Sequence, residues 1–217
     1  MLTQKKMVEI VLELANDRPI FHSEDDFKFA LAWLIKKKFP QSDIRLEYPV
    51  RSVANNKVKF LGDKYIDLLV TLGESQFPIE LKYKTRTFSS IINGEIYQLK
   101  NHAAENENRY RFWRDVWRIE NFGFNRGFII FLTNNPRYSK EGDRKDCDDK
   151  AFRIHDNRVT KRGTIRWRDP NSKTASKNEF VSPIKLTGGY TLHWRDFSEV
   201  NECPKGKFEY LLVEVNK

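Results

Sequence analysis

The sequence has few of the residues that build disulfide frameworks or zinc sites. It contains two cysteines, Cys147 and Cys203, which are far apart and outside any CxxC pattern. The four histidines are scattered and show no HxxxH or HExxH spacing, so a surface or capping role explains each better than a role as a metal ligand. A reduced, cytoplasmic protein without structural zinc is the simplest interpretation.

Two further absences narrow the choice of function. No apolar run approaches the roughly 18 residues of a membrane span, and acidic residues interrupt the apolar stretch near the N-terminus, which argues against a secretory signal. The sequence has no GxxxxGK[ST] or GxGxxG motif. A nucleotide-dependent enzyme is therefore disfavoured, and we expect no membrane association.

The chain has an excess of basic residues over acidic ones. Its 217 residues include 39 Lys and Arg against 30 Asp and Glu, which gives a net charge of +9 at pH 7. Such a balance favours a polyanionic partner such as nucleic acid. Many basic proteins bind no nucleic acid, however, so the charge by itself does not decide the function. The length suits one domain, or one domain with a sizeable insertion.

Two helices are predicted near the N-terminus. Apolar residues recur at helical spacing over residues 3–16. The second helix starts after Ser23, a good N-cap residue, with three acidic residues in its first turn and three lysines in its last. Pro40 ends it.

Strands and helices alternate up to residue 134. Strands are predicted at 44–50, 57–60, 65–72 and 77–84, helices at about 95–104 and at 109–120, and a strand buried on both faces at 127–133. This order predicts an α/β domain in which helices flank a mixed sheet.

The composition changes after residue 138. Charged and small polar residues dominate 139–182, which we interpret as an insertion or a set of long loops with a short strand at 163–168. Apolar character returns within 190–215, where strands complete the fold. We therefore expect a single domain over residues 1–217, with a core at about 20–134 and a basic, loop-rich C-terminal half.

The predicted hairpin of the third and fourth strands carries the most informative charged residues. Asp67 stands in a largely apolar strand, and Glu80 and Lys82 alternate with apolar residues in the next. A connection of two or four residues, with Leu72 opposite Phe77, puts Asp67 opposite Lys82. An odd-numbered loop would turn one strand over and separate them. With an even loop, the three charged residues lie on one face, and diagonal neighbours are about 7–8 Å apart at Cα.

This set of residues fits metal-assisted hydrolysis. Mg²⁺ prefers oxygen ligands and keeps several waters, so Asp67, Glu80 and the carbonyl of Leu81 could hold it. The cation can acidify a water and stabilise a phosphate, while Lys82 can orient or deprotonate that water or counter the phosphate charge. The alternative is an ordinary amphipathic hairpin in which Asp67 pairs with Lys82. In either case a carboxylate in an apolar strand needs a partner.

Asp67 followed by Glu80-Leu81-Lys82 on consecutive strands, after a helix with acidic residues, resembles the PD-(D/E)XK nuclease superfamily. Ile66 stands where the motif has proline. The resemblance implies a restriction-endonuclease-like core, a mixed sheet flanked by helices. It also implies phosphodiester hydrolysis with Mg²⁺ as the cofactor, for which Mn²⁺ could substitute. Asp67, Glu80 and Lys82 would be the catalytic residues.

The same resemblance suggests roles for further residues. Glu24 resembles the helix-borne acid that supports the metal, although a carboxylate that stabilises the helix N-terminus explains it equally well. Gln98, on the helix predicted at 95–104, matches a position where some members place Gln or Lys near the active site; a solvated helix face is the alternative. Lys84 shares the face of Lys82 and could touch phosphate or only solvent.

Basic residues interleaved with aromatic residues are candidates for nucleic-acid contact. One group lies on a single face of the helix at 109–120, where it could follow a phosphate backbone. Equally, some of these arginines could pair with Asp115 and Glu120 while the tryptophans of the helix form core. A second group surrounds Trp167 and could enter a groove, stack on bases or form a solvated loop. The residues are Arg114, Arg118, Arg162, Arg166 and Arg168.

The sequence thus predicts a metal-dependent nuclease that acts on DNA as an endonuclease, and a homodimer is compatible with this activity. The rival prediction is a non-catalytic nucleic-acid-binding or regulatory module that keeps the same fold.

Overall fold

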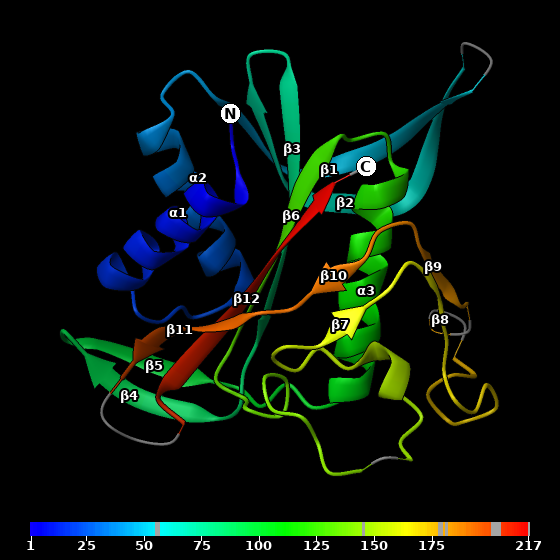
Figure 1. The fold of residues 1–217 in the computed structure, drawn as a ribbon. Helices are drawn as coiled ribbons and strands as arrows, with labels where there is room; N and C mark the ends of the chain where they lie inside the picture. The colour runs from blue at the N-terminus through cyan, green and yellow to red at the C-terminus, as the bar shows by residue number, and fades with distance from the viewer. Residues whose placement is uncertain (55–56, 145, 178–179, 181, 201–204, 217) are drawn as a thin grey trace.

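A computed structural model describes residues 1–54, 57–144, 146–177, 180, 182–200 and 205–216 of the chain. Its centre is a six-stranded mixed sheet (Figure 1). In spatial order the strands are β1 (Asp43–Ala54), β2 (Lys57–Leu72), β3 (Ser75–Lys84), β6 (Arg126–Thr133), β12 (Lys207–Asn216) and β11 (Trp194–Glu199). The predicted α/β class with a mixed sheet is confirmed. The strands predicted at 57–60 and 65–72 belong to one continuous strand, β2.

Helices α1 (Gln4–Asp17) and α2 (Glu24–Lys38) cover one face of the sheet (Figure 1). The predicted N-cap of α2 is confirmed, because the Ser23 hydroxyl accepts a hydrogen bond from the Asp26 backbone N–H at 3.1 Å. This cap fixes where α2 begins, and so fixes which of its first-turn side chains point toward the sheet.

Helix α3 (Glu105–Asn121) covers the opposite face and connects the parallel pair of strands. Strands β3 and β6 run parallel, with Glu80 beside Ile129 and Lys82 beside Phe131. A parallel connection needs a crossover, and α3 supplies it. The crossover brings the polar face of α3 close to the charged residues of β3.

The two faces of the sheet build two separate cores. Leu81 and Tyr83 of β3 pack in the core with α1 and α2, whereas Ile129 of β6 packs in the core with α3. Successive side chains of a strand point to opposite faces. Glu80 therefore points to the α3 side, whereas its neighbours Ile79 and Leu81 point to the α2 side.

The helix predicted at 95–104 is wrong. This segment contains β5 (Glu95–Leu99), which pairs with β4 (Phe88–Ile92) in a hairpin. Asn93 and Gly94 make its two-residue turn with positive φ angles of 51° and 83°, the conformation that Asn-Gly favours between two strands. The alternation of exposed and buried residues along β5 is the period of a strand and not of a helix.

The segment between the sheet strands β6 and β11 is rich in loops. Between residues 139 and 192 the described elements are short, and they form two small two-stranded sheets against α3 (Figure 1). These elements are the 3₁₀ turn η1 (Lys150–Phe152), β7 (Val159–Thr160), β8 (Gly163–Ile165), β9 (Ile184–Leu186) and β10 (Tyr190–Thr191). The strand expected at 163–168 is shorter than predicted. Trp167, which follows it, enters the core beside α3.

The start of β6 is too crowded for any side chain. A Cβ atom at Gly127 would lie 2.7 Å from Pro78 Cγ and 2.8 Å from both Ile119 Cγ2 and the Pro78 carbonyl oxygen. We expect Gly127→Ala to lower the free energy of unfolding by about 1–3 kcal/mol through overpacking, measured by urea denaturation. Gly142→Ala is the control, because its Cβ would meet only the Arg153 guanidinium at 3.4 Å. Equal stability of the two variants would contradict the expectation.

Candidate active site

The register of the β2–β3 hairpin differs from the predicted one by two residues. Leu72 pairs with Ser75 and Leu68 with Ile79, so the loop consists of Gly73 and Glu74 alone. The prediction that Leu72 faces Phe77 is therefore wrong. A shift of two preserves the parity that predicted Asp67 near Glu80 and Lys82, although the observed pairing ends at Leu68 and Ile79, one residue short of Asp67 and Glu80. The convergence of these residues survives the corrected register.

Strands β2 and β3 stop pairing just where the charged residues begin. The last paired residues are Leu68 and Ile79. Beyond them, the Leu81 backbone N–H donates to Asp67 Oδ2 at 2.7 Å, and the Tyr83 N–H donates to Glu24 Oε2 at 2.7 Å. Two carboxylates thus replace the strand partners that these N–H groups would otherwise need.

Glu24 is therefore more than a helix-terminal charge. Its Oε2 atom also pairs with Lys84 Nζ at 2.8 Å. The structure places both residues at the open edge of β3, next to the candidate site, and joins them in an ion pair. Lys84 therefore does not meet only solvent, and Glu24 keeps its place in the first turn of α2 while it binds β3.

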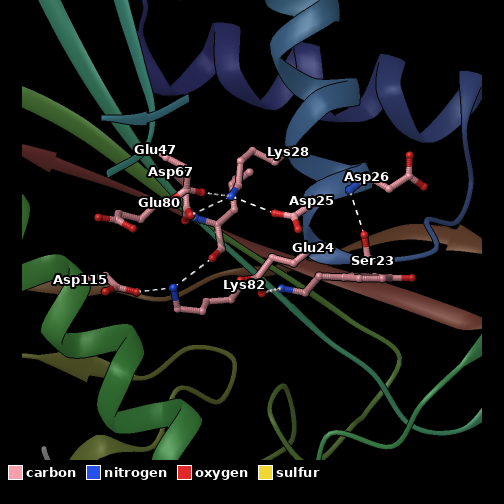
Figure 2. A network of polar contacts seen from close by, with 12 residues as sticks. Ser23, Glu24, Asp25, Asp26, Lys28, Glu47, Asp67, Glu80, Lys82 and Asp115 are labelled. Atoms are coloured by element: carbon pink, nitrogen blue, oxygen red, sulfur yellow. Dashed lines mark hydrogen bonds and ion pairs between the residues drawn. The ribbon is translucent and has the colours of Figure 1, made fainter. Parts of the chain in front are cut away.

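Lys28 of α2 reaches into the same opening (Figure 2). Its Nζ atom lies 3.4 Å from Asp67 Oδ1 and 3.1 Å from Asp25 Oδ1, and it also bonds to Glu47 Oε1. Although burial lowers the pKa of Lys28, the bond to Glu47 and the nearby carboxylates outweigh burial and raise it overall. Lys28 is therefore a charged ammonium in the folded protein.

Glu47 reaches this position through an unusual backbone conformation. It lies within β1, yet its φ angle is +47°, a left-handed value that is uncommon for residues other than glycine. Its neighbours Leu46 and Tyr48 pair normally with Leu68 and Ile66 of β2. The irregularity is thus local, and it is next to Asp67.

A second network connects β3 to α3. Arg118 Nη2 lies 2.5 Å from Glu80 Oε1 and 2.9 Å from Asp115 Oδ1, and Lys82 Nζ lies 2.7 Å from Asp115 Oδ2 (Figure 2 labels Glu80, Lys82 and Asp115). Lys82 Nζ also donates to the Leu81 carbonyl at 3.0 Å. The predicted alternative of an Asp67–Lys82 pair is therefore not observed: Lys82 pairs with Asp115, and Asp67 with Lys28.

Burial makes the charges of this network interact strongly. The side chain of Glu80 is 1% exposed, and burial together with the Asp115 carboxylate raises its pKa well above the ordinary range, against the effects of Arg118 and Lys82. Burial lowers the pKa of Lys82, but the carboxylates of Asp115, Glu80 and Asp67 outweigh burial and raise this pKa overall. Burial therefore favours the protonated form of Glu80, and the surrounding carboxylates favour the ammonium form of Lys82.

A small cavity opens beside this network. Its volume is about 200 Å³, and its lining is mainly cationic. The lining residues are Lys82, Arg111, Arg114, Asp115 and Arg118. Arg114 and Arg118, the predicted nucleic-acid contacts on α3, therefore border the space next to Lys82.

Other predicted contacts lie outside the site. Gln98 is an exposed residue of β5 opposite Ser89, not a helical residue facing the site. In the C-terminal half, Arg162, Arg166 and Arg168 are exposed. Arg168 pairs with Asp146 at 2.9 Å. The Trp167 ring is buried, with its indole N–H donating to the Phe180 carbonyl at 2.9 Å, so this tryptophan is unavailable for stacking on bases.

Sequence reasoning missed Lys28 and the contact of Asp115 with Lys82, whereas the alternative that an α3 arginine pairs with Asp115 is confirmed for Arg118. Lys28 carried a weak signal, because it is a lysine beside the apolar stripe of α2, four residues after Glu24. Asp115 is a buried acid between Trp113 and Val116, and a buried carboxylate requires a partner. Neither signal identifies the partner, which comes from a different element of the fold.

The residues present fit a hard divalent cation in the chemistry of their donors. Among the residues described, no three His, Cys, Asp or Glu side chains form a ready metal-binding group. Mg²⁺, however, is commonly held by one or two carboxylates with water completing its shell. Asp67, Glu80 and the Leu81 carbonyl are oxygen donors of this kind, and they lie where β2 and β3 separate. The donor set is therefore suitable for Mg²⁺ or Mn²⁺.

No protein-family model, curated protein or solved structure matches this chain. Within the described residues, no helix combines the length and apolar character needed to cross a membrane. What the site does must therefore be inferred from its own geometry.

Proposed function

We propose that the protein is a metal-dependent nuclease of the PD-(D/E)XK type that hydrolyses phosphodiester bonds, with DNA as the expected substrate. The supporting observation is that Asp67, Glu80 and Lys82 come together where β2 and β3 separate: Asp67 accepts the Leu81 N–H between the other two residues, and its charge acts on both. Asp67, Glu80 and the Leu81 carbonyl would hold Mg²⁺. The cation would supply an activated water and stabilise negative charge on the phosphate.

The state of Lys82 defines its role. The Asp115 carboxylate, 2.7 Å from Lys82 Nζ, and the other nearby carboxylates raise the pKa of Lys82, which favours a role as an ammonium over a role as a general base. As an ammonium it can donate a hydrogen bond to a phosphate oxygen and counter charge that develops during hydrolysis. Of the roles that the sequence left open for this lysine, electrostatic stabilisation is the one that the surrounding charges favour.

The cationic cavity beside Lys82 provides a place for the substrate phosphate. Arg114 and Arg118 line it together with Lys82, and arginine offers planar, forked donors that match phosphate oxygens. Contacts of this kind position a nucleic-acid backbone without reading its sequence. Binding should therefore weaken as the salt concentration rises.

The test is a cleavage assay on plasmid, linear duplex, single-stranded DNA and RNA with Mg²⁺, Mn²⁺ or EDTA. We expect cleavage only with a metal, and a loss of at least about 100-fold for Lys82→Met, because fixed charges at a developing negative charge commonly contribute this much. Lys185→Met, which removes an exposed lysine of β9, is the control and should keep the wild-type rate. Cleavage that survives Lys82→Met would remove Lys82 from the catalytic assignment.

A non-catalytic nucleic-acid-binding module is the second candidate. The observation that favours it is that α3 engages both Glu80 and Lys82, through Arg118 and Asp115 respectively. Salt-sensitive binding to every substrate, with no cleavage under any metal condition, would favour this module over the nuclease.

A further inference from the structure

Lys28 has an environment that ordinary surface lysines lack. Its side chain is 8% exposed, and three carboxylates from three separate elements surround its ammonium: Asp25 of α2, Glu47 of β1 and Asp67 of β2 (Figure 2). Enclosing a cation in this way costs desolvation energy that only close negative charge offsets. The ammonium thus acts as a resident cation at the edge of the proposed metal site.

Asp67 has one oxygen available for a cation, and Lys28 faces it. Oδ2 of Asp67 accepts the Leu81 N–H at 2.7 Å, which keeps the open strand edge satisfied. Oδ1 lies 3.4 Å from Lys28 Nζ. A metal ion that binds Asp67 through Oδ1 must therefore approach the position next to the ammonium, where two cations repel one another strongly.

The contacts of Lys28 show how it can withdraw. Its 3.4 Å contact to Asp67 is longer than the 3.1 Å contact to Asp25. The Glu47 and Asp25 side chains are 55% and 89% exposed, respectively, so they can follow the ammonium outward. Lys28 can give up Asp67 and keep its other two partners.

We propose that Lys28 is a tethered competitor for the divalent cation: its ammonium occupies Asp67 in the metal-free protein and moves onto Glu47 and Asp25 when metal binds. This inference rests on the proposed function, because it assumes that Asp67 is a metal ligand. In the metal-free state Lys28 neutralises carboxylates that would otherwise repel one another. In the metal-bound state its displacement lowers the apparent affinity of the site, so that Lys28 sets the metal concentration at which the enzyme becomes active.

The test is Mn²⁺ binding, followed by the electron paramagnetic resonance signal of free Mn²⁺. Without the competing ammonium, Lys28→Met should bind Mn²⁺ at least about tenfold more tightly than wild type. If the ammonium blocks the site in about nine of ten wild-type molecules, the apparent affinity of wild type is about tenfold lower. Lys28→Arg keeps the charge and should stay near the wild-type affinity. Lys38→Met, which removes a lysine paired with Glu13 at the other end of α2, is the matched control.

Wild-type protein provides a second measurement that needs no substitution. In a lysine-labelled sample, the Lys28 ammonium, which is buried and hydrogen-bonded, should give a protected NMR signal, assigned by its absence in Lys28→Arg. Saturating Mg²⁺ should weaken or shift this signal. A signal unchanged by bound Mg²⁺ would overturn the proposal.

Failure of this proposal differs from failure of the nuclease function. If wild type binds Mn²⁺ and Lys28→Met binds it no more tightly, Lys28 does not compete, and the nuclease assignment is unaffected. If neither protein binds Mn²⁺, Asp67 is not a metal ligand, and both proposals are wrong.

Discussion

Replacing Asp67 by asparagine is expected to reduce kcat/KM for phosphodiester cleavage by at least about 100-fold, because a metal ion contributes several kcal/mol of transition-state stabilisation and each factor of ten corresponds to about 1.4 kcal/mol. Asparagine has the same shape as aspartate and its side-chain oxygen can still accept the Leu81 N–H. The substitution removes the negative charge that a metal needs, while the open edge of β3 stays satisfied.

The fold should survive this substitution. Lys28 would lose its 3.4 Å contact to Asp67 but would keep its bonds to Glu47 and Asp25. Asp43→Asn, which removes an exposed carboxylate paired with Arg45 on β1, is the control and should keep wild-type activity. An Asp67→Asn variant that is folded and fully active would exclude Asp67 as a metal ligand.

Replacing Arg118 by methionine is expected to destabilise the protein by about 3–5 kcal/mol at neutral pH, the usual cost of leaving a buried charge without its partner. Arg118 bridges Glu80 and Asp115, whose side chains are almost completely buried. Without it, Glu80 would retain only the more distant Lys82, whose own close contact is with Asp115. Arg45→Met at the surface pair with Asp43 should change stability by no more than about 1 kcal/mol.

The loss of stability in Arg118→Met should shrink as the pH falls. The pKa of Glu80 in the folded protein is raised, chiefly by burial and by Asp115, and removal of Arg118 raises it further. A carboxyl group with a folded pKa above its unfolded pKa binds more protons in the folded state. The loss of folding stability caused by burying ionised Glu80 is therefore present above the folded pKa. It is removed as the pH falls through that value toward the unfolded pKa of about 4.5.

Urea unfolding between pH 5 and 8 measures this effect. The double substitution Glu80→Gln with Arg118→Met should lose the pH dependence, because no carboxyl remains at residue 80. If the penalty of Arg118→Met were the same at every pH, the destabilisation would come from lost packing and not from an uncompensated Glu80.

Local patterns predicted much of the fold, because they depend on neighbours in sequence. The Ser23 cap gave the start of α2, and the even loop placed Asp67 with Glu80 and Lys82 even though the register itself was wrong by two residues. A register error of two leaves the face of every side chain unchanged. Whether the loop has an even or an odd number of residues was therefore a safer basis for predicting the site than the exact residue pairs.

The helix predicted at 95–104 failed although the local signal for a hairpin was present. Asn93-Gly94 is a strong two-residue turn sequence, and the following residues alternate with the period of a strand. Giving the turn priority over the search for a helix would have placed Gln98 on β5. The wrong helix had placed Gln98 near the candidate site, and the observed hairpin removes it from there.

The ion-pair partners could not have been predicted in this way. Lys28 meets Asp67 because α2 packs on one face of the sheet, and Asp115 meets Lys82 because the crossover helix α3 packs on the other. Such contacts depend on packing between distant segments. The sequence therefore suggested the candidate residues, whereas the structure shows the side chains that pair with them.

The measurement that tests the proposed nuclease most directly is cleavage of labelled duplex DNA by one preparation in Mg²⁺, after EDTA, and after Mg²⁺ is restored, with Asp67→Asn run in parallel. The proposed site predicts cleavage that stops with EDTA, returns with Mg²⁺ and is nearly absent in Asp67→Asn. Cleavage that continues in EDTA and is unchanged in Asp67→Asn would contradict the proposal that Asp67 and Glu80 hold a catalytic metal ion.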